Sequence, residues 1–165
     1  MNRLNLFLCA IVLSLLSIPA QSTSPYGLCT STETTVFSCQ TTKQKLISLC
    51  GTLPGTLQYR FGKPDHMELR YPENAVNGTA YFKYAHFMRP QTDRFEINFC
   101  NQGVDYTIFD YTEEGKSRAG IRIVTIDGTE SEIICSDKIE SQLHKLKKHL
   151  PCDSENALNM GNCPQ

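Results

Sequence analysis

The stretch from Val36 to Gly51, VFSCQTTKQKLISLCG, contains two apolar runs separated by a polar turn, with one cysteine in each run. Such runs on either side of a short polar segment predict a β-hairpin. With a tight turn near Thr42, Cys39 and Cys50 are offset by about 13 Å along the hairpin, at roughly 3.3 Å per residue. A disulfide needs Cα atoms within about 7 Å, so we expect each cysteine to bond a partner elsewhere in the chain.

The first 20 residues have the pattern of a secretory signal peptide. Arg3 supplies a positive charge, and a nearly unbroken apolar run from Leu4 to Ile18 follows it. This run is short for a membrane span, which needs about 20 apolar residues. We therefore expect cleavage near Ala20–Ser22, a secreted or periplasmic location, and no transmembrane segment after cleavage. The alternative is an uncleaved N-terminal anchor.

The mature chain that remains would be about 145 residues long, which fits one domain. Removing the leader takes away one basic residue, Arg3, and leaves a net charge of −2, with 15 basic and 17 acidic residues. A chain without an overall positive field is a poor match for nucleic acid. We therefore expect no nucleic-acid partner.

Period-two alternation runs through most of the region from residue 36 to residue 136. Phe95, Ile97 and Phe99, for example, fall on one face of a segment, and the polar residues between them fall on the other. This alternation is typical of half-buried strands. The expected strands are 36–40, 45–50, 56–61, 67–71, 79–88, 94–100, 104–111, 119–126 and 130–135. Short turns such as Asp127-Gly128 join antiparallel neighbours, so we predict a mainly β fold, an antiparallel meander that forms a small barrel or sandwich.

The pattern changes on both sides of this β domain (36–136). Residues 21–35 are rich in Ser and Thr and predict an extended lead-in. After Cys135, apolar residues recur at intervals of four, three and four, as in one stripe of an amphipathic helix: Ile139, Leu143, Leu146 and Leu150. Asp137 and Glu140 have the spacing of a capping box. We predict a helix over 137–150, then a Cys-containing tail over 151–165.

Seven cysteines remain once Cys9 leaves with the leader, and an oxidising compartment makes disulfides the default. Three bridges among seven cysteines allow 105 arrangements. We favour three pairs. Cys39–Cys135 would close a barrel, Cys152–Cys163 is local, and Cys29–Cys50 is a guess. Cys100 is the candidate for a free thiol, which allows either a monomer or a thiol-linked dimer.

Motifs for metal or catalytic chemistry are absent from the sequence. There is no C-x-x-C and no H-E-x-x-H, and His144 and His149 would not share a face of a helix. His66 and His86 are not flanked by a nucleophile motif. We therefore assign no catalytic residue, metal or cofactor, and favour a non-enzymatic protein while leaving enzymatic activity open.

Two aromatic segments are candidate binding surfaces. Tyr59, Arg60 and Lys63 place aromatic and basic groups beside a turn, where they would suit an anionic or sugar-like ligand or a partner's carboxylates. The favoured alternative is an ordinary strand with Tyr59 packed inward and Arg60 facing water. The segment 81–88 has aromatic residues on both faces, and we expect it to belong to the core, covered by the C-terminal helix.

The F-x-C, I-x-L-C-G and Y-x-F-G-K-P motifs, in this order, resemble the N-terminal part of small uncharacterised exported proteins of Gram-negative bacteria. The matching residues are Phe37, Cys39, Lys45, Ile47, Leu49, Cys50, Tyr59, Phe61, Gly62, Lys63 and Pro64. The resemblance covers roughly residues 36–64 and weakens toward Cys135. It implies an exported β-rich bacterial protein and carries no known activity.

These observations favour a secreted or periplasmic, non-enzymatic binding or interaction protein with a protein or envelope-glycan partner. One version is an inhibitor of an envelope enzyme, which is an analogy at the level of fold. The alternatives are a small secreted hydrolase, which would need a histidine beside an acid in a pocket, and an envelope component that dimerises through its free thiol.

Overall fold

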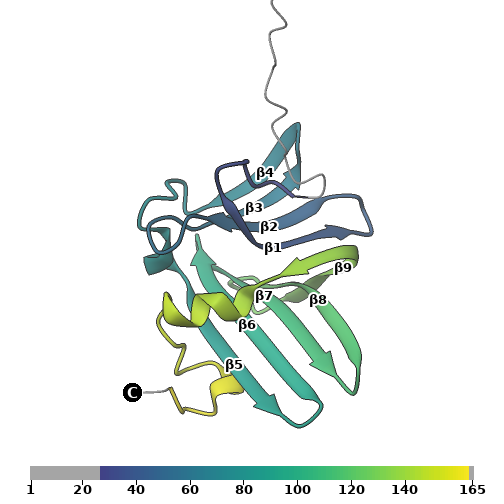
Figure 1. Cartoon of the computed structure of the whole chain (residues 1–165), viewed down its shortest axis with the longest axis vertical. Coiled ribbons are helices and arrows are strands. Elements are labelled where there is room, and N and C mark those ends of the chain that lie inside the picture. Colours follow the sequence, from purple (N-terminus) through teal and green to yellow (C-terminus); the bar gives the residue numbers. More distant parts are fainter. Residues whose placement is uncertain (1–26, 164–165) are drawn as a thin grey trace, which may run out of the picture.

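Nine antiparallel strands form one continuous sheet in the computed structural model, which describes residues 27–163 (Figure 1). The predicted signal peptide and its cleavage site lie outside these residues. The strands are β1 (Thr34–Thr41), β2 (Leu46–Gly51), β3 (Gln58–Lys63), β4 (His66–Tyr71), β5 (Lys83–Arg89), β6 (Thr92–Asn101), β7 (Val104–Glu113), β8 (Lys116–Val124) and β9 (Glu130–Ser141). Their order across the sheet is β4-β3-β2-β1-β9-β8-β7-β6-β5, so the antiparallel meander is confirmed.

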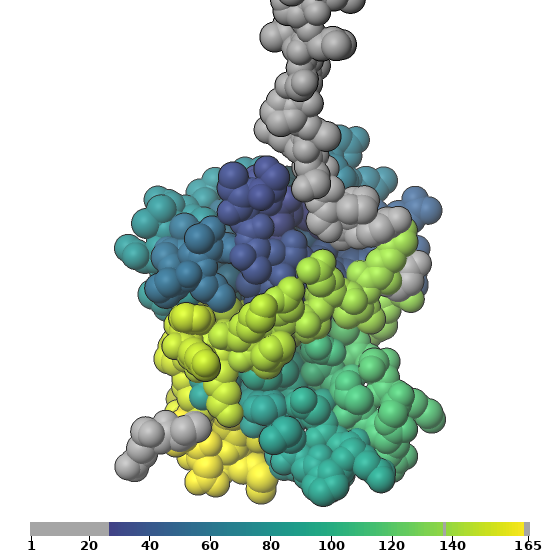
Figure 2. Space-filling model, viewed as in Figure 1, coloured from purple at the N-terminus to yellow at the C-terminus, as the bar shows by residue number. Residues whose placement is uncertain are grey.

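The sheet is not closed into a barrel, so that part of the prediction is wrong. The first part of β9 pairs with β8 and the second part with β1, which joins the two halves of the sheet along one strand. Figure 2 shows this seam as a yellow-green band between the two halves. The halves meet through aromatic side chains: Phe99 of β6 lies with its ring centroid 5.1 Å from Tyr59 of β3 and 4.9 Å from Tyr71 of β4.

The C-terminal tail lies along the first part of the free edge of β5. The Tyr84 N–H donates to the Pro151 carbonyl (3.0 Å), and the Asp153 N–H donates to the Tyr84 carbonyl (2.8 Å). Two residues further along β5, the His86 N–H donates to Asn159 Oδ1 at 3.1 Å. Covering an edge strand in this way satisfies its backbone groups and prevents further strand addition.

The predicted helix over 137–150 is wrong. β9 continues through Ser141 because Glu140 and Ser141 pair with Ser38 and Phe37 of β1. A short 3₁₀ helix, η2 (Leu143–Lys148), then follows. The apolar stripe is nevertheless largely buried, since Leu143, Leu146 and Leu150 join the core, while Ile139 on the strand is exposed. The leucines therefore reflect burial, and cross-strand pairing overrides the helical period over the first five residues.

Two further 3₁₀ helices complete the described secondary structure, η1 (Gly78–Tyr81) before β5 and η3 (Ala157–Asn159) in the tail. Three disulfides staple the fold, and they are the pairs that the sequence favours: Cys29–Cys50, Cys39–Cys135 and Cys152–Cys163. Of the cysteines between residues 27 and 163, Cys100 is the free one. Among residues 27–163, none of the helices is long and apolar enough to cross a membrane.

Candidate functional site

The predicted binding residues Tyr59, Arg60 and Lys63 do not form one surface. Tyr59 is a core residue with 2% of its surface exposed, and Lys63 is exposed at the end of β3. The Arg60 side chain does not face water, because most of it is covered. Period-two alternation placed Tyr59 correctly, but it could not show what covers Arg60.

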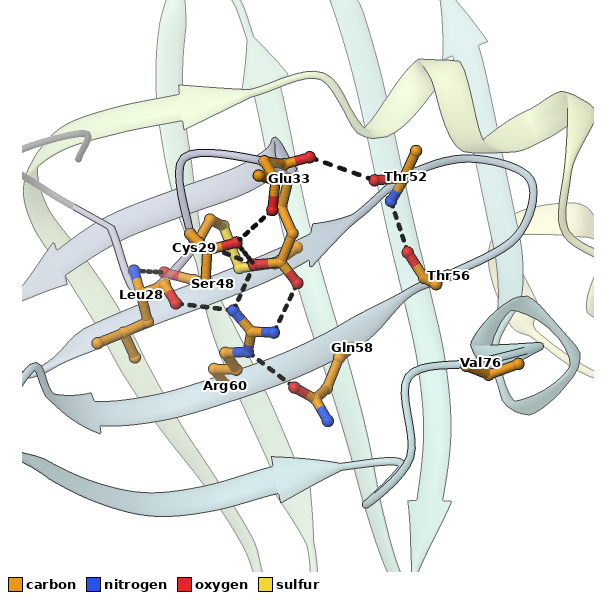
Figure 3. A network of polar contacts seen from close by, with 12 residues as sticks. Leu28, Cys29, Glu33, Ser48, Thr52, Thr56, Gln58, Arg60 and Val76 are labelled. Carbon is orange, nitrogen blue, oxygen red and sulfur yellow. Dashed lines mark hydrogen bonds and ion pairs between the residues drawn. A yellow bond between two sulfur atoms is a disulfide. The ribbon is translucent and has the colours of Figure 1, made fainter. Parts of the chain in front are cut away.

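Arg60 is held in a polar network that closes the N-terminal segment over the sheet (Figure 3). Its two Nη atoms each donate to a carboxylate oxygen of Glu33 at 2.7 Å. It also donates to the Leu28 carbonyl and to Gln58 Oε1, both at 2.8 Å. This bidentate pair, with side chains 12% and 14% exposed, is a structural clamp rather than a ligand site.

The basic side chains that gather on one open surface lie instead on the outer face of β5–β8. Backbone register places Arg94 of β6, Tyr111 of β7 and Arg118 of β8 in one row across the strands. The surface bounds a hollow of about 650 Å³. Its cationic members, which we call the arginine face, are Arg89, Arg94, Lys116, Arg118 and Arg122. Two acids, Glu113 and Glu114, line the same hollow.

Guanidinium groups of this face lie on aromatic rings. Arg118 and Arg122 lie over the Phe109 ring at 5.0 and 5.9 Å, and Arg94 lies over the Tyr111 ring at 5.6 Å. Phe109 has room for this because Gly120 is opposite to it; a Cβ there would come within 3.0 Å of the Phe109 ring and collide with a backbone carbonyl. Stacked guanidiniums lose less conformational freedom on binding than free ones.

Several of these arginines are also held by carboxylates. Arg94 pairs with Glu113, Arg118 pairs with Glu132, and Arg122 lies 3.4 Å from both Glu130 and Glu132. Arg89 and Lys116 differ, because no carboxylate of residues 27–163 lies within ion-pair distance of either. They are exposed at the rim and are the cations most available to a partner.

A buried carboxylate, Glu96, anchors the inner side of this surface. It is 3% exposed and accepts hydrogen bonds from the Tyr111 hydroxyl and from Asn156 Nδ2 at 2.6 Å. Arg122 lies 3.5 Å away. Burial, and then the hydrogen bond to Glu96, raise the pKa of Tyr111 to about 12, so its hydroxyl stays a donor. The cluster ties the arginine face to the C-terminal tail.

The free thiol of Cys100 lies on β6, outside the arginine face, and its surroundings make it a weak nucleophile. The hydrogen bond to Asp105, followed by burial, raises the pKa of Cys100. Since the thiolate is the reactive form, we expect slow alkylation near neutral pH. Asp105→Asn should make alkylation measurably faster between pH 7 and 8, read by mass spectrometry after iodoacetamide treatment. An unchanged rate would contradict the role of Asp105.

Local sequence patterns do not reveal the arginine face, because its members lie on three strands, β5, β6 and β8, between residues 89 and 122. A usable signal was present, since hairpin turns set the register that aligns Arg94 with Tyr111 and Arg118. The aromatic segment 81–88 is mostly core, with Phe82 and Tyr84 buried, although Tyr81 and Met88 are exposed. Comparisons with protein-family models, with curated proteins and with solved structures find no match for this chain.

Proposed function

We propose that this is an exported, non-enzymatic binding protein whose arginine face engages carboxylates of an acidic segment on a partner protein. The observation that carries the proposal is the hollow lined by five cations and two acids on a chain whose net charge is −1. The leader pattern and three intramolecular disulfides support export. An envelope enzyme with an acidic surface is a natural partner for such a face.

The form of the face suits recognition of planar carboxylates. A guanidinium presents two parallel N–H donors that match both oxygens of a carboxylate. Because Arg94, Arg118 and Arg122 are already fixed by rings and carboxylates, they set the shape of the site. Arg89 and Lys116 supply charge that is not already neutralised by an ion pair. Rigid strands hold all five groups, which reduces the entropy cost of binding.

One feature of the structure would suit the alternative function, a small hydrolase: a histidine lies beside an acid. His86 Nε2 lies 2.9 Å from Asp93 Oδ1 on neighbouring strands. No hydroxyl or thiol of the described residues is hydrogen-bonded to the His86 ring, and Asp93 is largely exposed. A nucleophile activated by a histidine base needs such a contact. The geometry therefore favours binding over hydrolysis.

The test is a binding comparison between Arg89→Ala/Lys116→Ala and the unmodified mature protein. Both residues are exposed and without ion pairs in the described chain, so we expect the fold to be unchanged. An ion pair made by an exposed side chain contributes about 0.2–1 kcal/mol, so we expect the loss of both cations to weaken the affinity for a hexaglutamate peptide by about two- to thirtyfold. Calorimetric titration measures the affinity. Capture from envelope extract with the mature protein then identifies the natural partner.

The matched control is Lys63→Ala/Arg70→Ala, which removes the same charge from β3 and β4, far along the sheet order from the arginine face. It should bind hexaglutamate almost as the unmodified protein does. Equal losses in both variants would mean that net charge alone drives binding and would contradict the proposal. Capture of an acidic glycan in place of a protein would overturn the partner class.

A further inference from the structure

A second hollow, of about 510 Å³, has the opposite character. It lies where β4, η1, β6 and β7 meet the C-terminal tail, and we call it the tyrosine hollow. Its aromatic lining comes from these four elements: Tyr71, Tyr81, Phe99 and Tyr106. None of these residues belongs to the arginine face.

The rings form a connected array. Tyr71 and Tyr106 both stack on Phe99, each with its ring centroid 4.9 Å from that of Phe99. Tyr81 meets the edge of this array at 6.0 Å from Tyr71, and 52% of its surface is exposed. Burial raises the pKa of both Tyr71 and Tyr106, so their rings stay neutral. Neutral electron-rich rings attract cations to their faces.

Polar groups of the same hollow are suited to a positively charged donor. Asp105, Asp153 and Glu155 line it, against one cation, Lys83. The Lys83 ammonium is 3.9 Å from Asp153 and its side chain is 55% exposed, so this ammonium is held only loosely. Asn98 also lines the hollow, and its buried Oδ1 accepts no hydrogen bond from residues 27–163. The oxygens open to a ligand with N–H groups are therefore those of the carboxylates.

We propose that the tyrosine hollow binds a primary ammonium group, such as the side chain of a lysine on a partner. The rings face its charge, the carboxylates neutralise it, and its N–H groups have oxygen acceptors around them. This site is independent of the arginine face and goes beyond the function proposed above.

The test uses Nα-acetyl-lysine methylamide as the probe and its Nε-acetylated form as the uncharged control, with binding followed by NMR titration of the mature protein. The charged probe should shift signals of the hollow, and the acetylated probe should not. Tyr81→Ala should weaken binding by about three- to fivefold, whereas Tyr81→Phe should keep it, because a phenyl ring still faces the cation. Asp105→Asn should also weaken it.

Two further variants make the result specific. Glu68→Gln removes an acid on β4 that does not line the hollow, and it should bind as the unmodified protein does. Arg89→Ala/Lys116→Ala should also leave probe binding unchanged, so failure of this site and failure of the arginine face give different results. Equal binding of both probes, or full binding by Tyr81→Ala and Asp105→Asn together, would overturn the proposal.

Discussion

Replacing Cys39 and Cys135 together by alanine is expected to lower the free energy of unfolding by about 4–5 kcal/mol, from the entropy of closing so long a loop. The two residues are 96 positions apart and buried, and they connect β1 to β9 at the seam between the halves of the sheet. Removing a bridge that closes a long loop gives the unfolded chain more conformational freedom than removing a bridge that closes a short loop. Urea unfolding followed by far-ultraviolet circular dichroism, with the other disulfides intact, measures the loss.

The matched comparison is the double replacement of Cys152 and Cys163 by alanine. These residues are only 11 positions apart, so the same entropic argument gives a loss of about 3 kcal/mol or less. The unfolding midpoint should therefore move less than for Cys39→Ala/Cys135→Ala. A larger loss in the tail variant would mean that covering the β5 edge matters more to stability than closing the seam.

Arg60→Met is expected to cost about 3–5 kcal/mol, because it leaves the largely buried Glu33 carboxylate without its partner. The Leu28 carbonyl and Gln58 Oε1 also lose a donor. The double variant Glu33→Gln/Arg60→Met removes the stranded charge and should recover part of the loss. Equal stability of the single and double variants would show that Glu33 reaches water once Arg60 is gone.

Stability against pH gives an independent check of the same clamp. Burial alone would raise the pKa of Glu33, but the hydrogen bonds from Arg60 and Thr30 outweigh it, and the pKa is lowered below its usual 4.5. A lowered pKa means that this stabilisation is complete above pH 4.5 and is lost as the pH falls through the folded-state value. Arg60→Met should therefore lose less stability than the unmodified protein on acidification below pH 4.5.

The hairpins of β6–β9 were predictable because their turns carry local signals. Asn101-Gln102-Gly103, Glu114-Gly115 and Asp127-Gly128 provide the positive φ that tight turns require, with Gly103, Gly115 and Gly128 at φ of 77°, 77° and 81°. Such signals act over a few residues and do not depend on the rest of the fold. The bounds of β6, β7 and β8 therefore lie within three residues of those expected, and β9 begins where expected but continues past residue 135.

Features that depend on distant pairing were not predictable in the same way. The segment after Cys135 has a helical period, yet β1 supplies a strand partner that no local pattern reveals. Arg60 and Glu33 are 27 positions apart, and the turn that brings them together is fixed by Cys29 and its disulfide. The arginine face depends on four strands aligned by three successive registers. In each case the decisive contact is non-local, while sequence periods report local geometry.

The tail along β5 also limits how the molecule can polymerise. Ordered fibres grow when each subunit offers two open edges, one for the copy before it and one for the copy after it. Here β5 is hydrogen-bonded to the backbone of Pro151 and Asp153 and to the Asn159 side chain, so β4 is left as the edge for adding another strand. Two molecules joined edge to edge through β4 would exhaust that surface, and growth would stop at a pair.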